Sequence, residues 1–161
     1  MKKILTFTLI VFGLAIMSSC SSTKNTGMNN IIATMQVEEP IPGVCNNSRV
    51  IAILPFLQNG QVEAQAPLTD QEIEEQLNSN VHFLQDKPDY NDKGMVNLII
   101  NCKGQMVRCE IDNKTKSTEL DQQLVAVFAK LEKWKAGSIN GESVDTSVLY
   151  SFTIENGKIH L

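Results

Sequence analysis

The clearest pattern in the chain is an alternation of apolar and polar residues over residues 95–111, interrupted at Lys103 and Gly104. Such alternation is typical of half-buried β-strands, and a glycine-containing pair between two such runs is typical of a hairpin turn. We therefore predict antiparallel strands over 95–102 and 105–111, with position 98 opposite position 109. One set of side chains is predicted to face the core: Val96, Leu98, Ile100, Cys102, Val107 and Cys109.

A first helix is predicted to begin after Thr69. Thr69 and Glu72 have the spacing of a capping box, in which each side chain accepts a hydrogen bond from the backbone of the other residue. Leu68 is placed to pack on Ile73, four residues into the helix, which fixes the angle at which the chain enters. We expect this helix to end near residues 78–80.

A second helix is predicted to begin at Ser117 or Thr118 and to end near residues 134–137, because apolar residues repeat there at helical spacing. Its apolar face consists of Leu120, Leu124, Val127, Phe128 and Leu131. We expect this face to pack on Leu98, Ile100, Val107, Val148 and Phe152.

Two more strands complete the predicted elements. Residues 49–54 are β-branched and apolar, and Pro55 bounds them. Residues 146–154 place four side chains on one face, Val148, Tyr150, Phe152 and Ile154. The turn Asn156-Gly157 then leads into a short tail that can pair again. Together these elements predict an α+β fold, in which a small antiparallel sheet of about three to four strands is covered on one face by two helices.

The amino-terminal residues have the organisation of an export signal. Lys2 and Lys3 precede an apolar run over residues 4–16, and Ser18 and Ser19 stand directly before Cys20. This stretch resembles the bacterial lipobox, which implies cleavage before Cys20, a diacylglycerol on its sulfur and usually an acylated new amino terminus. Two or more chains give stable membrane anchoring. An ordinary secretory signal or an uncleaved anchor helix are the alternatives.

The domain organisation follows from this reading. Residues 1–19 are predicted to be a lipoprotein signal peptide, and residues 20–44 to be the lipidated cysteine and a flexible tether, because 21–30 are small and polar. Residues 45–161 are predicted to form a single α+β domain. No later segment has the roughly 18 continuous apolar residues of a membrane-spanning helix.

Charge and motif content narrow the class of function. Lysine and arginine number 14 against 18 aspartate and glutamate residues, which disfavours nucleic-acid binding. The two histidines, His82 and His160, lie in no catalytic or metal-binding motif. We therefore expect a protein that is not an enzyme and has no cofactor, no metal site and no nucleic-acid partner.

Three cysteines remain if Cys20 carries lipid. The hairpin register separates Cys102 from Cys109 by about four residues along the sheet, or roughly 13 Å. A disulfide needs α-carbons within about 7 Å, so that pairing is disfavoured. A bond from Cys45 to either of the others, or buried free thiols, both stay open, and the odd count leaves at least one free thiol or an intermolecular bond.

An ordered set of short motifs over about residues 69–155 resembles the C-terminal domain of TonB, the periplasmic energy transducer. The matching positions are Gly104, Leu120-Asp121, Trp134-Lys135-Ala136-Gly137, Asn140-Gly141 and the strand from Val148 to Phe152. The resemblance implies about three antiparallel strands with helices on one face. The transducer has a histidine in its membrane helix and a long proline-rich spacer. Here residues 1–19 contain no histidine, and the segment between anchor and domain has only two prolines, Pro40 and Pro42, so energy transduction is not expected.

The leading expectation is a lipid-anchored, non-catalytic protein-binding or adaptor module that adds a strand from a partner protein to an exposed sheet edge, as the TonB resemblance suggests. The candidate edge is the final strand, with Thr146, Val148, Leu149, Tyr150 and Phe152. The alternative for this edge is that the segment around Ile51 or the tail at Ile159 covers it.

Two other functions stay open, a small thiol-dependent enzyme or redox protein using Cys102 or Cys109, and a purely structural envelope lipoprotein. The expected location is the outer membrane, facing the periplasm. Ser21 is not the aspartate that commonly retains lipoproteins at the inner membrane, and residues 21–30 lack the acidic residues linked to surface display in some Gram-negative groups.

Overall fold

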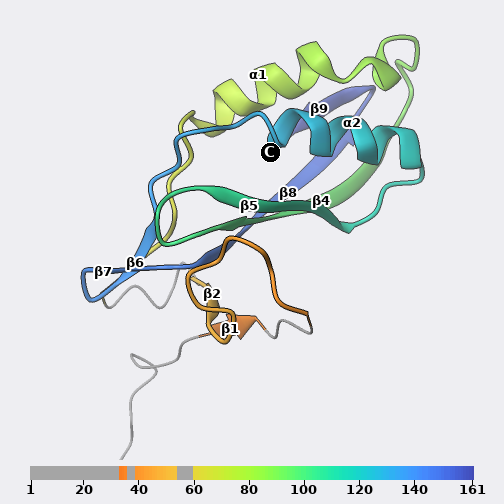
Figure 1. The fold of residues 1–161 in the computed structure, drawn as a ribbon. Coiled ribbons are helices and arrows are strands. Elements are labelled where there is room, and N and C mark those ends of the chain that lie inside the picture. The colour runs from red at the N-terminus through yellow and green to blue at the C-terminus, as the bar shows by residue number, and fades with distance from the viewer. Residues whose placement is uncertain (1–32, 36–38, 54–59) are drawn as a thin grey trace, which may run out of the picture.

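The computed structural model describes residues 33–35, 39–53 and 60–161, and the amino-terminal signal with Cys20 lies outside these ranges. The described residues form an α+β fold, as predicted, with two α-helices and mostly antiparallel sheets. The main sheet has six strands, more than the three to four expected, in the order β1-β2-β8-β4-β5, with β9 also pairing to β8 (Figure 1). Their bounds are β1 Ala33–Met35, β2 Val50–Ala52, β4 Asp92–Ile100, β5 Met106–Asn113, β8 Thr146–Glu155 and β9 Lys158–His160.

The predicted hairpin forms the centre of this sheet. Leu98 lies opposite Cys109, as the alternation predicts. The expected position of Val107 is wrong, because Ile99 pairs with Arg108 while Ile100 pairs with Met106. Val107 is therefore the extra residue of a β-bulge, and its side chain packs with Ile99 on the opposite face of the sheet.

The loop of the hairpin is longer than two residues. Asn101 organises it, because its carboxamide oxygen accepts from the backbone N–H groups of Lys103 and Gln105 at 3.0 and 2.9 Å. Gly104 has φ +75°, and a Cβ there would collide with the carbonyl oxygen of Trp134, so this turn position needs glycine.

The first helix, α1 (Asp70–Asn80), confirms its predicted start and end. Thr69 is the N-cap, and both hydrogen bonds of the capping box with Glu72 are present. Ile73 and Leu77 form its buried face. A short 3-10 helix, η2 (His82–Leu84), follows.

The second helix, α2 (Thr118–Phe128), begins after the N-cap Ser117 but ends earlier than predicted. Lys130 and Leu131 donate to carbonyl oxygens three residues back, at 3.1 and 3.0 Å, which tightens and ends the helix. Leu131 and Trp134 continue the apolar spacing although they lie beyond the end of the helix, and both are buried. The indole Nε1 of Trp134 donates to the Leu131 carbonyl oxygen at 2.8 Å.

Both helices cover one face of the main sheet (Figure 1). The core between the helices and the sheet contains the apolar face of α2 and the predicted sheet residues Leu98, Ile100, Val148 and Phe152. A fully buried aliphatic or aromatic side chain contributes roughly 1.5–3 kcal/mol, so this layer is the main source of stability. No helix among the described residues is long and apolar enough to cross a membrane.

A second, three-stranded sheet was not predicted. It consists of β3 Gln61–Val62, β6 Gly137–Ile139 and β7 Glu142–Val144, in the order β3-β6-β7. The turn between β6 and β7 is Asn140-Gly141, which confirms the turn expected there. Strands of two or three residues are too short to show a periodic pattern, which explains why the sequence did not reveal them.

The folded part begins earlier than the predicted boundary at Cys45. Strand β1 pairs antiparallel with β2, and Ile41 is buried. Ile41 packs with Val50 and Ile99 on the sheet face opposite the helices. Part of the segment expected to be a tether, residues 39–44, therefore covers the second face of the sheet.

Candidate functional site

The strand predicted over residues 146–154 forms as β8, but it is not a free edge. Over its whole length it pairs antiparallel with β4, from Thr146 opposite Ile100 to Ile154 opposite Asp92. On its other side β2 pairs with its first residues in parallel, and β9 pairs with its last residues. The segment around Ile51 and the tail at Ile159 thus cover the two ends, which corrects the expectation of an edge over the full strand.

The middle of β8 keeps one open side. Among the described residues no strand pairs with Val148 to Phe152 on the side away from β4. Backbone groups along a strand point alternately to its two neighbours. At one end of β8, the Ile51 N–H of β2 donates to the Asp145 carbonyl oxygen at 3.0 Å. At the other end, Glu155 pairs with Lys158 of β9 across a two-residue turn. The backbone groups of the odd-numbered residues of β8 therefore point to the side away from β4. The backbone N–H and C=O groups of Leu149 and Ser151 therefore point into the gap.

The predicted edge residues differ in their exposure. The side chains of Thr146, Val148 and Phe152 are buried, so they cannot contact a partner in the folded protein. Leu149 is 50% exposed, one of two large apolar side chains with that exposure among the described residues, and Tyr150 is half-buried. The candidate site therefore contracts to Leu149, Tyr150 and Ser151.

A groove of about 520 Å³ lies beside this open stretch. Its walls come from β8, from the segment between β3 and α1, from the first residue of α1 and from the residue after β9. They are Glu63, Ala64, Gln65, Ala66, Leu68, Asp70, Val148, Leu149, Tyr150, Ser151 and Leu161. Partial burial raises the pKa of Glu63. Burial, together with the negative charges of Asp70 and Glu63, raises the pKa of Tyr150 to about 12, so its phenol remains a hydrogen-bond donor at neutral pH. The groove therefore brings together apolar side chains, the two carboxyl groups of Glu63 and Asp70, and the outward-facing backbone groups of β8.

A disulfide joins Cys45 to Cys102, with 6.1 Å between the α-carbons. The sequence left open a bond from Cys45 to Cys102, a bond from Cys45 to Cys109, and buried free thiols. The structure has the first of these. Asp145, which is 2% exposed, lies against the disulfide. Its Oδ1 accepts from the backbone N–H groups of Cys45 and Cys102 at 3.0 and 2.9 Å, and its Oδ2 accepts from Asn46 at 2.7 Å. We call these three residues, Cys45, Cys102 and Asp145, the clasp.

The clasp is also the one cluster of described residues with metal-ligand geometry. Thiolate sulfur is the form that binds metal, and both sulfurs are consumed in the disulfide. The carboxylate of Asp145 already accepts three hydrogen bonds, so the arrangement is a cross-link between the amino-terminal segment, the hairpin loop and the start of β8.

Cys109 is the remaining thiol among the described residues. It is half-buried on the helix side of β5, and its sulfur donates to the Val125 carbonyl oxygen at 3.7 Å. Burial and the neighbouring charge of Glu110 raise the pKa of Cys109 to about 11. The thiol is therefore protonated at neutral pH and is a poor nucleophile.

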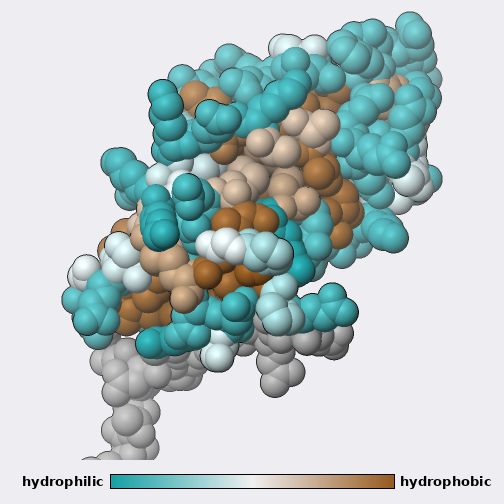
Figure 2. Space-filling model, in the orientation of Figure 1, coloured by the Kyte–Doolittle hydropathy of each residue, from teal (hydrophilic) through white to brown (hydrophobic). Residues whose placement is uncertain are grey.

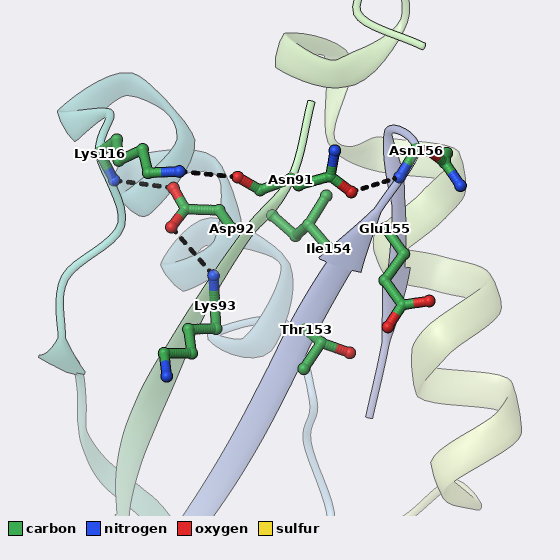
Figure 3. A pocket seen from close by; sticks show the side chains of 8 residues that line it. All are labelled: Asn91, Asp92, Lys93, Lys116, Thr153, Ile154, Glu155 and Asn156. Atoms are coloured by element: carbon green, nitrogen blue, oxygen red, sulfur yellow. Dashed lines mark hydrogen bonds between the residues drawn. The ribbon is translucent and has the colours of Figure 1, made fainter. Parts of the chain in front are cut away.

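A second pocket, of about 560 Å³, lies where β4 begins (Figure 3). Several of its polar groups form hydrogen bonds with one another. The carboxylate of Asp92 accepts from the backbone N–H groups of Lys93 and Lys116 at 2.9 and 2.8 Å and from the Tyr90 hydroxyl at 2.8 Å. The Lys116 amine donates to the Asn91 carbonyl oxygen at 2.9 Å. These bonds tie the β5–α2 loop to β4 and engage the carboxylate of Asp92 and the amine of Lys116.

The histidines do not form a catalytic constellation with these residues. His82 is exposed and interacts with Gln85, and His160 lies 3.2 Å from Glu74 at the surface. Sequence reasoning left the bond from Cys45 to Cys102 open, but it missed both the groove and the part of Asp145 in the clasp, because each joins residues from distant parts of the chain. Cys20, the predicted lipid attachment site, lies outside the described residues.

No protein-family model, curated protein or solved structure matches the chain.

Proposed function

We propose that this protein is a lipid-anchored envelope protein whose α+β domain binds a partner protein by accepting a strand at the open side of β8. The observation that carries the proposal is the gap between β2 and β9. There the backbone groups of Leu149 and Ser151 point into a groove with no strand partner among the described residues. Strand addition satisfies such groups, and side chains along the groove then select the partner.

The proposed anchor is an acylated Cys20 after removal of residues 1–19. The disulfide between Cys45 and Cys102 supports export, because disulfides form and persist mainly in oxidising compartments such as the bacterial periplasm. The proposed location is the outer membrane, facing the periplasm. Intact mass measurement of the protein from the membrane fraction tests the anchor. We expect the mature chain from Cys20 plus acyl groups, and an unmodified cysteine or a retained signal contradicts it.

The TonB-like reading is also a proposal. It is supported by the order of hairpin β4–β5, helix α2 and strand β8, and by the packing of α2 on that hairpin. The parallel pairing of β2 with β8 and the second sheet are additions to the arrangement that the resemblance implies. We propose a shared mode of binding, strand addition, and not energy transduction, because the sequence lacks the transducer's histidine and long spacer.

We propose a binding role and not a catalytic one. The thiol hypothesis named Cys102 or Cys109, but Cys102 is in a disulfide and the raised pKa of Cys109 leaves little thiolate at neutral pH. In the pocket of Figure 3 the carboxylate of Asp92 and the amine of Lys116 are engaged by neighbouring groups. The groove at β8 is thus the better supported site.

Site-specific crosslinking in intact cells tests the strand site. A photoreactive residue at Leu149 is expected to capture a partner, whereas the same residue at Thr153 is not. Thr153 is the matched control, because it is exposed on the same face of β8 but its backbone is paired with β9. Equal capture at both positions, or none at Leu149, contradicts the proposal.

The substitution Ser151→Pro tests the backbone contact itself. Its N–H points away from β4, so proline removes a hydrogen-bond donor of the gap without breaking the β4–β8 ladder. We expect loss of the Leu149 crosslink with the domain still folded. Ser151→Ala keeps the N–H and is expected to keep the crosslink, so loss with both variants would point to a side-chain effect instead.

A further inference from the structure

Strand β5 ends the main sheet on the side away from β2, and among the described residues no strand pairs with its outer side. Figure 2 shows apolar side chains gathered over β5 in the centre of the view. The half-buried apolar residues of this strand are Met106, Val107, Cys109 and Ile111. Each of them packs against one of the two cores and keeps part of its surface exposed. An unpaired strand with partly exposed apolar residues is a surface that readily pairs with another strand.

The hydrogen-bonding pattern of the sheet fixes which groups of β5 face outward. In β4 the even-numbered residues face β8, so Asn97 and Ile99 face β5, where they lie opposite Glu110 and Arg108. The backbone N–H and C=O groups of Cys109 and Ile111 therefore point away from the sheet. The side chains of Arg108 and Glu110 lie on the face opposite the helices, 3.6 Å apart, with 36% and 50% of each exposed.

We propose that β5 pairs antiparallel with β5 of a second copy of this chain, with Cys109 opposite Cys109 of the other copy. An added strand must match outward-facing residues to outward-facing residues. The registers next to the proposed one therefore differ from it by a shift of the partner strand by two residues. Shifting it one way places Arg108 opposite Arg108, and shifting it the other way places Glu110 opposite Glu110. The proposed register places Arg108 of each copy opposite Glu110 of the other. Cross-strand charges thus select one register, since like charges directly opposite are destabilising.

Two β-bulges limit the length of this contact. Val107 and Asp112 are the extra residues where the β4–β5 register shifts, so the regular part of the edge is residues 108–111. Bulges also serve to protect free edges from pairing. The proposed dimer is therefore weak, and it forms best where copies are concentrated on a membrane. It does not depend on the proposed strand site, because β4 separates β5 from the gap at β8.

Disulfide trapping of the full chain in bacterial membranes tests the register. Opposed residues in a hydrogen-bonded antiparallel pair have α-carbons about 5.5 Å apart, within the range of a disulfide. Because the thiol of Cys109 is protonated at neutral pH, oxidation is carried out at alkaline pH, where the thiolate fraction is larger. It is expected to give a dimer linked through Cys109, absent in Cys109→Ser. In Arg108→Glu or Glu110→Arg like charges oppose each other at both ends of the pair, so we expect about tenfold less dimer.

The charge exchange provides the decisive control. Arg108→Glu combined with Glu110→Arg in one chain restores opposite charges in the same register, so the dimer is expected to return to the wild-type yield. Two differently tagged single variants expressed together are expected to form mixed dimers. Sedimentation of the full chain in detergent gives a readout that does not need the thiol. A wild-type chain that is monomeric by both methods, or a dimer indifferent to these charges, overturns the proposal, as does capture of a different protein along β5.

Discussion

The two faces of the main sheet are covered in different ways. On one face, α1 and α2 bury a continuous apolar layer that includes Phe128 and Phe152. On the other, three buried residues, Ile41, Val50 and Ile99, are reinforced by the clasp. The first face depends on many small contributions from burial, and the second on a few strong links between distant segments. The two faces should therefore fail under different perturbations.

The largest effect is expected on the helix-covered face. Phe128→Ala removes a fully buried aromatic ring, which costs roughly 3–5 kcal/mol of unfolding free energy. Leu149→Ala is the control, because that side chain is half exposed, and we expect about 0.5 kcal/mol or less. Denaturant unfolding measures both. Similar costs would contradict the assignment of the core to this face.

Removing the disulfide should act on the opposite face. The pair Cys45→Ser and Cys102→Ser opens a loop of 57 residues, for which chain entropy predicts about 4 kcal/mol, with measured values typically 2–4. Amide exchange should rise first over residues 39–50, while α1 and α2 remain protected. Uniform loss of protection would show that the two faces are a single unit of stability.

Asp145→Asn tests the polar part of the clasp. Its carboxylate receives three backbone N–H groups while almost fully buried, and the substitution turns one acceptor oxygen into a donor that faces other donors. Hydrogen bonds to charged groups contribute about 1.5–3 kcal/mol each, and we expect a total loss in that range. The effect should be smaller once the disulfide is removed, since both links hold the same segment. Strict additivity would argue that they act separately.

The smallest effect concerns the cap of α1. Thr69→Ala is expected to cost about 1 kcal/mol, because it removes the N-cap hydrogen bond. Hydrogen bonds from the Thr69 backbone and side chain lower the pKa of Glu72. The capping contribution is therefore present above the unfolded-state pKa of Glu72 and is lost as the pH falls through the folded value. Thermal unfolding from pH 7 to pH 3 measures this, and a Thr69→Ala effect that grows on acidification would be inconsistent.

The features of the fold that could be predicted are those whose signals are local. The capping box of α1, the pairing of Leu98 with Cys109, and the strand after Thr146 each depend on residues a few positions apart or across one turn. The predicted end of α2 is too late because Leu131 and Trp134 keep helical spacing beyond Phe128, the last residue of the helix. Apolar spacing reports burial, and it does not distinguish a helix from a chain that folds back over it.

The rest of the structure depends on contacts between distant residues. The Asp145 hydrogen bonds span 43, 99 and 100 residues, and the disulfide spans 57. A lone aspartate before a strand carries no local sign of such partners. The same limit affected the candidate site. The strand was predicted correctly, and coverage by the segment around Ile51 or by the tail at Ile159 was named as the alternative to a free edge, but the sequence could not decide between the two.

Residue-resolved amide exchange of the free protein tests the open side of β8 most directly. The N–H groups of Val148 and Tyr150 face β4, while those of Leu149 and Ser151 face the gap. We predict that the second pair exchanges at close to the rate of an unprotected amide and that the first pair is strongly protected. Equal, strong protection of all four would mean that the gap is filled within the molecule, and it would contradict strand addition at this site.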